Sequence, residues 1–96
     1  MRSIIQHDEN TCFLCGESGG AMDWHHCFGA SAKPASEAYG LKVRLHHFGC
    51  HMYGEKAVHG NKDTMDYIHR VAQEKAMEYY GWDKGDFIRI FGKNYI

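Results

Sequence analysis

The fold is decided by residues 41–51, which read LKVRLHHFGCH. In the first half of this segment, apolar Leu41, Val43 and Leu45 alternate with two basic residues. This period of two is typical of a β-strand with one buried face. The second half supplies histidines and a cysteine, whose imidazole and thiolate groups bind zinc and related metals. The segment therefore predicts a strand that leads directly into a group of metal ligands.

A Cys-x-x-Cys pair, Cys12 and Cys15, lies upstream of this segment and is followed by a glycine. Such a knuckle directs two sulfurs at one ion, and tetrahedral zinc then needs two more ligands. Cys50 supplies the third ligand and either His46 or His47 the fourth; the position of His46 at the end of the predicted strand favours His46. The alternative is a pair of merely buried thiols, but the specific spacing favours a structural zinc.

A second set of ligands consists of histidines. His25 and His26 lie near the end of a first predicted strand, Ala21–Phe28. Because neighbouring residues on a strand face opposite ways, one of them can bind a metal while the other faces a substrate or solvent. His51 and His59 provide two further imidazoles for the same ion as His25. Three protein ligands and an open coordination position are typical of a catalytic metal site, whereas a single His is more often a surface residue.

The chain between and after these ligands is organised simply. The second predicted strand is Leu41–Leu45, and a loop, Gly29–Gly40, joins it to the first. Cys27 fits neither ligand set and is interpreted as a buried thiol of the first strand. After the second strand, the cluster leads through a short helix or turn to His59.

The chain beyond residue 61 has helical periodicity. Asn61, Asp63 or Thr64 can cap the start of a helix, and Gly81 suits its left-handed end. A second short helix is predicted from Lys84 to Phe91, closed by Gly92. Apolar residues recur along both segments at the three- and four-residue steps of an amphipathic helix. The residues predicted to face inward are Met65, Ile68, Val71, Ala72, Ala76, Tyr79, Tyr80, Phe87, Ile88 and Phe91.

The composition narrows the class of protein. The 96 residues have room for one small domain (1–96), with a metal-rich part (11–61) and a helical part (62–96), and metals often reinforce such small cores. The formal charge is −1, so affinity for a polyanion must come from a local patch and a metal. No signal peptide or membrane span is visible, which predicts a cytoplasmic protein with no membrane partner. Four Cys interleaved with His favour metal binding over disulfides there.

The combined pattern resembles the HNH (His-Asn-His, ββα-metal) nuclease superfamily, in particular its small bacteriophage members with a zinc knuckle. Cys12-x-x-Cys15, His25-His26, Cys50-His51 and His59 carry the resemblance. Residues 40–45, 57–59 and 91–96 also look like those phage proteins. The resemblance implies an α+β fold with a small ββα-metal core, a structural zinc knuckle and C-terminal helices. If the chain is phage-encoded, it implies the cytoplasm of the bacterial host.

The resemblance also implies roles for individual residues. His25 falls at the position that binds a catalytic divalent ion (Mg²⁺, Mn²⁺ or Zn²⁺), His51 at a further metal ligand and His59 at a possible third. His26 falls at the general base that takes a proton from the attacking water. The zinc ligands of relatives are usually all Cys; here His46 stands where the third Cys is expected, and one extra residue, Gly49, follows.

The middle Asn of the family motif is absent. It should lie in the loop before the second strand, where it orients the general base, and no Asn occurs between Phe28 and Leu45. Ser31, Lys33, Ser36 or a backbone carbonyl are the candidates to replace it.

The expected function is metal-dependent hydrolysis of DNA phosphodiester bonds with little sequence preference. Lys42 and Arg44 on the second strand are candidates to hold neighbouring phosphates. The alternative is a non-catalytic zinc module that binds DNA or a partner protein, and the missing Asn favours it. A redox role for Cys12 and Cys15 is disfavoured because a thioredoxin-like strand pattern is absent. The expected partner is DNA, and the chain is expected to be a monomer or a homodimer.

Overall fold

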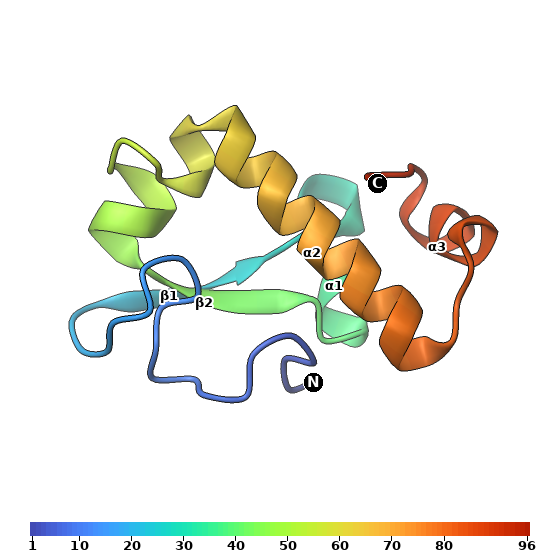
Figure 1. Ribbon diagram of the computed structural model, residues 1–96, viewed down its shortest axis with the longest axis horizontal. Helices are drawn as coiled ribbons and strands as arrows, with labels where there is room; N and C mark the ends of the chain where they lie inside the picture. The colour runs from blue at the N-terminus through green and yellow to red at the C-terminus, as the bar shows by residue number, and fades with distance from the viewer.

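The computed structural model describes all 96 residues, and its architecture is the predicted α+β arrangement. Strands β1 (Met22–His26) and β2 (Lys42–His46) pair into an antiparallel hairpin. Helix α2 (Lys62–Tyr80) follows, and α3 (Lys84–Phe91) lies at the end of the molecule where α2 finishes (Figure 1). The order of two strands and then a helix is the ββα outline.

The hairpin separates two faces. In its register His25 lies opposite Val43, and His26 lies opposite Lys42. Val43 and Leu45 are fully buried and belong to the same core as Ile68 of α2. Strand alternation therefore directs His25 to the side of the core and His26 to the other side.

Both strands differ slightly from their predicted ranges. β1 is shorter than residues 21–28, and β2 begins and ends one residue later than residues 41–45. Ladder-like bonds nevertheless continue past both ends, from the Cys27 N–H to the Leu41 carbonyl at 2.9 Å and from the His47 N–H to the Ala21 carbonyl at 2.9 Å. The hydrogen-bonded pairing of the two chain segments therefore extends beyond the strand ranges at both ends.

The connection between the strands was predicted as a loop, and this was wrong in part. It contains a 3₁₀ turn, Ala30–Ala32, and a short helix, α1 (Lys33–Ala38). Pro34 lies in the first turn of α1, where its fixed φ suits a helix and its missing N–H costs nothing. Six residues are too few to display an apolar stripe, which is why the periodicity did not reveal this helix.

The segment between β2 and α2 carries most of the remaining ligands. A π-helical turn, His47–Met52, follows β2 directly, and a 3₁₀ turn, Val58–Gly60, precedes α2. The N–H groups of Tyr53 and Gly54 both donate to the Phe48 carbonyl, at 2.9 and 3.0 Å. This wide turn places Cys50 and His51 next to the end of the hairpin.

Helices α2 and α3 begin and end as predicted. Of the three candidate caps, Asn61 is the one used, since its side chain accepts from the Thr64 N–H at 3.0 Å. Gly81 and Gly92 close α2 and α3 in the left-handed conformation, with φ of 69° and 84°. None of the helices combines the length and the apolar character needed to cross a lipid bilayer.

Two of the residues predicted to face inward are corrected by the structure. The side chains of Tyr79 and Ile88 are 59% and 39% exposed. Each lies at the edge of its helix's apolar stripe, where the helical period turns the side chain away from the core. A polar residue, Gln73, is fully buried instead, and it accepts from the Tyr95 N–H at 2.7 Å and donates to the Asn94 side chain at 2.8 Å.

The N-terminal segment runs along the outer edge of β2. The Ile4 N–H donates to the Gly40 carbonyl at 2.9 Å, and the Ser3 hydroxyl donates to the Lys42 carbonyl at 2.6 Å. Gly40 has a φ of +71°, and an added Cβ would overlap the Arg2 carbonyl oxygen. Glycine is therefore required where α1 turns back into β2.

The substitution Gly40→Ala should lower the free energy of unfolding by about 3 kcal/mol, because the cost of a left-handed backbone and the cost of the overlap with the Arg2 carbonyl are added together. Gly92→Ala is the matched control: its φ of +84° is similar, but no atom lies within 4 Å of the added Cβ. That variant should lose only about 1 kcal/mol. Urea denaturation of both variants measures the difference, and equal losses would show that the close approach at Gly40 is unimportant.

Candidate functional site

The first ligand cluster joins the Cys-x-x-Cys knuckle to the end of β2. One ligand atom from each of Cys12, Cys15, His46 and Cys50 lies within 4.8 Å of the others. The Cys15 Sγ and the His46 Nδ1 are 3.2 Å apart. Three sulfurs and one imidazole nitrogen gathered in this way form a donor set suited to tetrahedral zinc, and the cluster is consistent with a structural Zn²⁺ site.

The choice between His46 and His47 is made by hydrogen bonds. The Nε2 of His46 lies 2.8 Å from the Gly19 carbonyl oxygen, which can only accept. The proton of a neutral His46 is therefore on Nε2, and the lone pair of Nδ1 faces the sulfurs. This is the usual arrangement for a metal-binding histidine. His47 turns the other way and contacts Asp23.

Backbone bonds hold the knuckle to the hairpin. The Gly16 N–H donates to the Cys12 carbonyl at 2.9 Å, and the Phe13 N–H donates to the Arg44 carbonyl of β2 at 2.8 Å. Burial acts to raise the pKa of the Cys12 thiol, but N–H groups of the knuckle donate to its sulfur and lower this pKa overall. A thiol with a lowered pKa gives up its proton to a metal more readily.

Cys27 stays outside the cluster, as the sequence predicts. It is 1% exposed within the core, and burial raises the pKa of its thiol.

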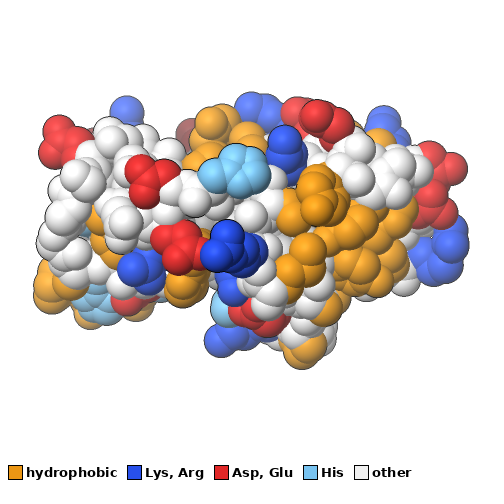
Figure 2. Space-filling model, turned by 90° about the horizontal axis from the view of Figure 1, so that it is seen from below, with side chains coloured by type: hydrophobic (Ala, Val, Ile, Leu, Met, Phe, Trp, Pro, Cys, Tyr) orange, Lys and Arg blue, Asp and Glu red, His pale blue; other side chains and the backbone are white.

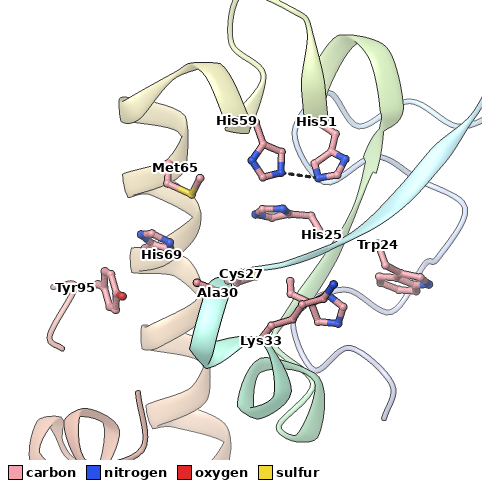
Figure 3. Close-up of a pocket in the computed structure, with 12 residues that line it drawn as sticks. Trp24, His25, Cys27, Ala30, Lys33, His51, His59, Met65, His69 and Tyr95 are labelled. Atoms are coloured by element: carbon pink, nitrogen blue, oxygen red, sulfur yellow. Dashed lines mark hydrogen bonds between the residues drawn. The ribbon is translucent and has the colours of Figure 1, made fainter. Parts of the chain in front are cut away.

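The second cluster contains the three predicted imidazoles. His25 comes from β1, His51 from the π-helical turn and His59 from the turn before α2, and Figure 3 shows their rings converging. The Nε2 atoms of His51 and His59 are 3.0 Å apart, and one nitrogen from each ring lies within 4.8 Å of the others. Ligands of a tetrahedral ion with bonds of about 2.0–2.1 Å are separated by roughly 3.3 Å, and the nitrogens of His51 and His59 are already close to this spacing.

His25 provides the strongest indication that this cluster fits a metal. Its Nε2 is the one buried side-chain polar atom in the protein without a hydrogen-bond partner. Burial, and then the neighbouring His51, lower the pKa of His25 to about 3. The ring is therefore neutral at physiological pH, with a lone pair for which the protein supplies no donor. A divalent ion would satisfy this nitrogen.

Asp23 orients this cluster, and sequence reasoning missed it. Its Oδ2 accepts from the Nδ1 of His51 at 2.8 Å and from the Nδ1 of His47 at 2.5 Å. The contacts with His47 and then His51 lower the pKa of the Asp23 carboxyl group. With its Nδ1 proton held, His51 points its Nε2 lone pair at the cluster. The sequence could have indicated Asp23, because the two-residue period of a strand places it on the same face as His25.

His26 lies on the opposite side of the strand from the three imidazoles. Its Nε2 is 2.9 Å from the Oε1 of Glu37, a residue of α1. The two basic residues predicted to hold phosphates share this face. The Nζ of Lys42 is 2.9 Å from the Glu37 carboxylate, and Arg44 donates to the Glu9 carbonyl at 2.9 Å. Both cations also lie over the Trp24 ring, 5.1 Å from its centre.

An open hollow of about 540 Å³ lies beside the three imidazoles. Its lining includes His25, His51 and His59 together with His26, and it extends to α2. Figure 3 shows Met65 and His69 of α2 along one wall and Lys33 on the other. Lys33 is exposed and forms no ion pair, so it is better placed than Lys42 to meet an anion near the imidazoles.

Comparison with protein-family models, curated proteins and solved structures finds no match to this chain. The assignment of chemistry therefore depends on the geometry of the two clusters.

The variant Cys15→Ser should bind one zinc equivalent less than the unmodified protein, because it loses one of four ligands. Structural zinc contributes on the order of 10 kcal/mol, so the free energy of unfolding should fall by at least about 3 kcal/mol. Metal analysis by mass spectrometry and urea denaturation measure both effects. Cys27→Ala is the control: it should keep all its zinc and lose about 1 kcal/mol. Unchanged zinc in Cys15→Ser would contradict the cluster.

Removing the orienting carboxylate should weaken the histidine cluster alone. In Asp23→Ala, the dissociation constant for Co²⁺, titrated into protein whose cysteine cluster already holds zinc, should rise about 10- to 100-fold. Glu74→Ala, on the exposed face of α2, should bind Co²⁺ like the unmodified protein. A Co²⁺ affinity unaffected by Asp23→Ala would show that His51 does not need this partner.

Proposed function

We propose that the protein is a metal-dependent endonuclease of the HNH type that hydrolyses DNA phosphodiester bonds. One observation carries the proposal: His25, with its unpartnered buried nitrogen, lies with His51 and His59 in the same open hollow that His26 lines from the other side of the strand. A site that combines open metal ligands with a separate imidazole suits hydrolysis of a stable phosphate ester.

His25, His51 and His59 would hold a divalent ion, Mg²⁺, Mn²⁺ or Zn²⁺. When bound, such an ion supplies stabilisation of the negative charge that builds on the phosphoryl oxygens and the leaving alkoxide. His25 contributes to this by being neutral and buried, since it neither repels a cation nor exchanges it readily for a proton.

His26 acts as the general base. An imidazole is partly unprotonated at neutral pH and can accept a proton from an attacking water. The water oxygen forms a bond to phosphorus as its proton moves to His26, and the bond from phosphorus to the leaving sugar oxygen breaks. The leaving alkoxide takes a proton from solvent. The side chain of His26 is 17% exposed, so water can reach it.

Binding of DNA should be weak and independent of sequence. The net charge of −1 provides little long-range attraction. Figure 2 shows one face of the molecule on which Lys and Arg lie singly or in small groups among acidic residues, with apolar side chains gathered toward one end. Lys33, inside the hollow and free of ion pairs, is proposed to contact the phosphate in place of Lys42, whose ammonium group is held by Glu37.

The second candidate is a non-catalytic zinc module that binds DNA or a partner protein. The absence of the motif Asn between the strands favours it. It requires one metal per chain, at the cysteine cluster, and no cleavage.

The two candidates are separated by incubating the purified protein with supercoiled plasmid and a panel of divalent ions. The nuclease should produce nicked or linear plasmid in a metal-dependent way. His26→Ala should reduce the rate at least 100-fold, on the order expected for loss of a general base, with unchanged metal content. His7→Ala, at an exposed histidine, is the control and should cut normally. Unaltered cutting by His26→Ala would rule out His26 as the base.

A further inference from the structure

The carboxylate of Glu37 is the partner of His26 in the hairpin connection. Its Oε1 lies 2.9 Å from the His26 Nε2, and the Lys42 ammonium group donates to both oxygens, at 3.2 and 2.9 Å. The amino group of Met1 also donates to Oε2 at 3.0 Å. The contacts with His26, then Lys42, lower the pKa of Glu37 to about 2, so the group is a carboxylate that only accepts.

The other side chains considered for the missing Asn do not contact His26. Ser31 is exposed and forms no side-chain hydrogen bond. Lys33 is a cation and cannot accept a proton from an imidazole N–H. The Ser36 hydroxyl is already used, because it accepts from the Phe28 N–H at 3.3 Å and donates to the Leu41 carbonyl at 2.5 Å.

The contact with Glu37 decides which nitrogen of His26 carries the proton. A carboxylate can only accept a hydrogen bond, so the contact with Glu37 requires a proton on Nε2 of His26. A neutral His26 then has its lone pair on Nδ1. Nδ1 has no hydrogen-bond partner in the chain and is not among the buried polar atoms, so solvent reaches it. The nitrogen able to accept a proton is thus the free one.

Lys42 completes the arrangement from the neighbouring strand. It lies opposite His26 in the hairpin register, and its side chain is only 12% exposed. An ammonium group on the second side of the carboxylate neutralises its charge and restricts its rotation. Glu37 is therefore held between two strand residues rather than free on the surface of α1.

We propose that Glu37 is the positioning residue of the active site: it holds His26 through Nε2 and leaves Nδ1 to receive the proton of the attacking water. This rests on the proposed nuclease function. It assigns to an acidic residue of α1 the orienting role for which the sequence offers no Asn, and it gives Lys42 the supporting role of fixing Glu37.

The test uses a readout that does not need activity. Long-range ¹H–¹⁵N NMR of the zinc-loaded protein reports the tautomer of each histidine, and His26 should be protonated on Nε2. In Glu37→Ala this preference should be lost, whereas Glu37→Gln should keep it because the amide oxygen still accepts. Glu78→Ala, an exposed acid of α2, should leave the His26 signals unchanged. His26 protonated on Nδ1, or a tautomer unaffected by Glu37→Ala, would overturn the proposal.

Plasmid cleavage provides a second measurement that tests the same proposal. Glu37→Ala should lower kcat about 100- to 1000-fold with little change in KM, and Glu37→Gln should recover much of the loss. Zinc content and thermal unfolding establish that each variant is folded, and Glu37→Gln serves if the alanine variant is not. Lost tautomer preference in a protein that never cuts DNA would reject the nuclease and leave the His26–Glu37 contact established. Full cutting by Glu37→Ala would reject the positioning role and leave the nuclease.

Discussion

The gathering of three thiols and His46 at one point is the constraint on which the rest of the structure depends. A chain of 96 residues buries a limited core, and here that core contains few large aliphatic side chains. The cysteine cluster joins the N-terminal knuckle, the end of β2 and the π-helical turn at one point. Because Cys50 and His51 are neighbours, the same constraint fixes a ligand of the second cluster.

The two sides of the hairpin surround their histidines with different chemical groups. The side facing α2 keeps His25 neutral by burial and orients His51 through Asp23, so it is suited to a cation. The other side surrounds His26 with a carboxylate and an ammonium group and leaves one ring nitrogen to solvent. Two histidines adjacent in sequence thus experience opposite environments. Separation of this kind is what a site needs when one group binds a metal and another moves a proton.

Much of this could be predicted from local sequence signals. The alternation around Val43, the knuckle spacing and the capping residues each act over a few positions, and the structure has the hairpin, the helices and both clusters. Asp23 and Glu37 were missed because their roles depend on partners 28 and 11 residues away. A single acidic residue in a short helix or on a strand has no local pattern that distinguishes it from a solubilising one. The position of His46 at the end of the strand already favoured it over His47, and its contact with the Gly19 carbonyl supports this choice.

The alternation of β1 has a consequence for how this protein can vary between relatives. Substitutions along the strand alter one side chain at a time, but a shift of β1 by one residue against β2 would invert the strand, exchanging the environments of His25 and His26 at once. The buried nitrogen and the solvent-facing one would trade places, and Asp23 would leave its partners. Homologous chains should therefore differ freely in the length of the surrounding loops while keeping the spacing from residue 23 to residue 26 unchanged.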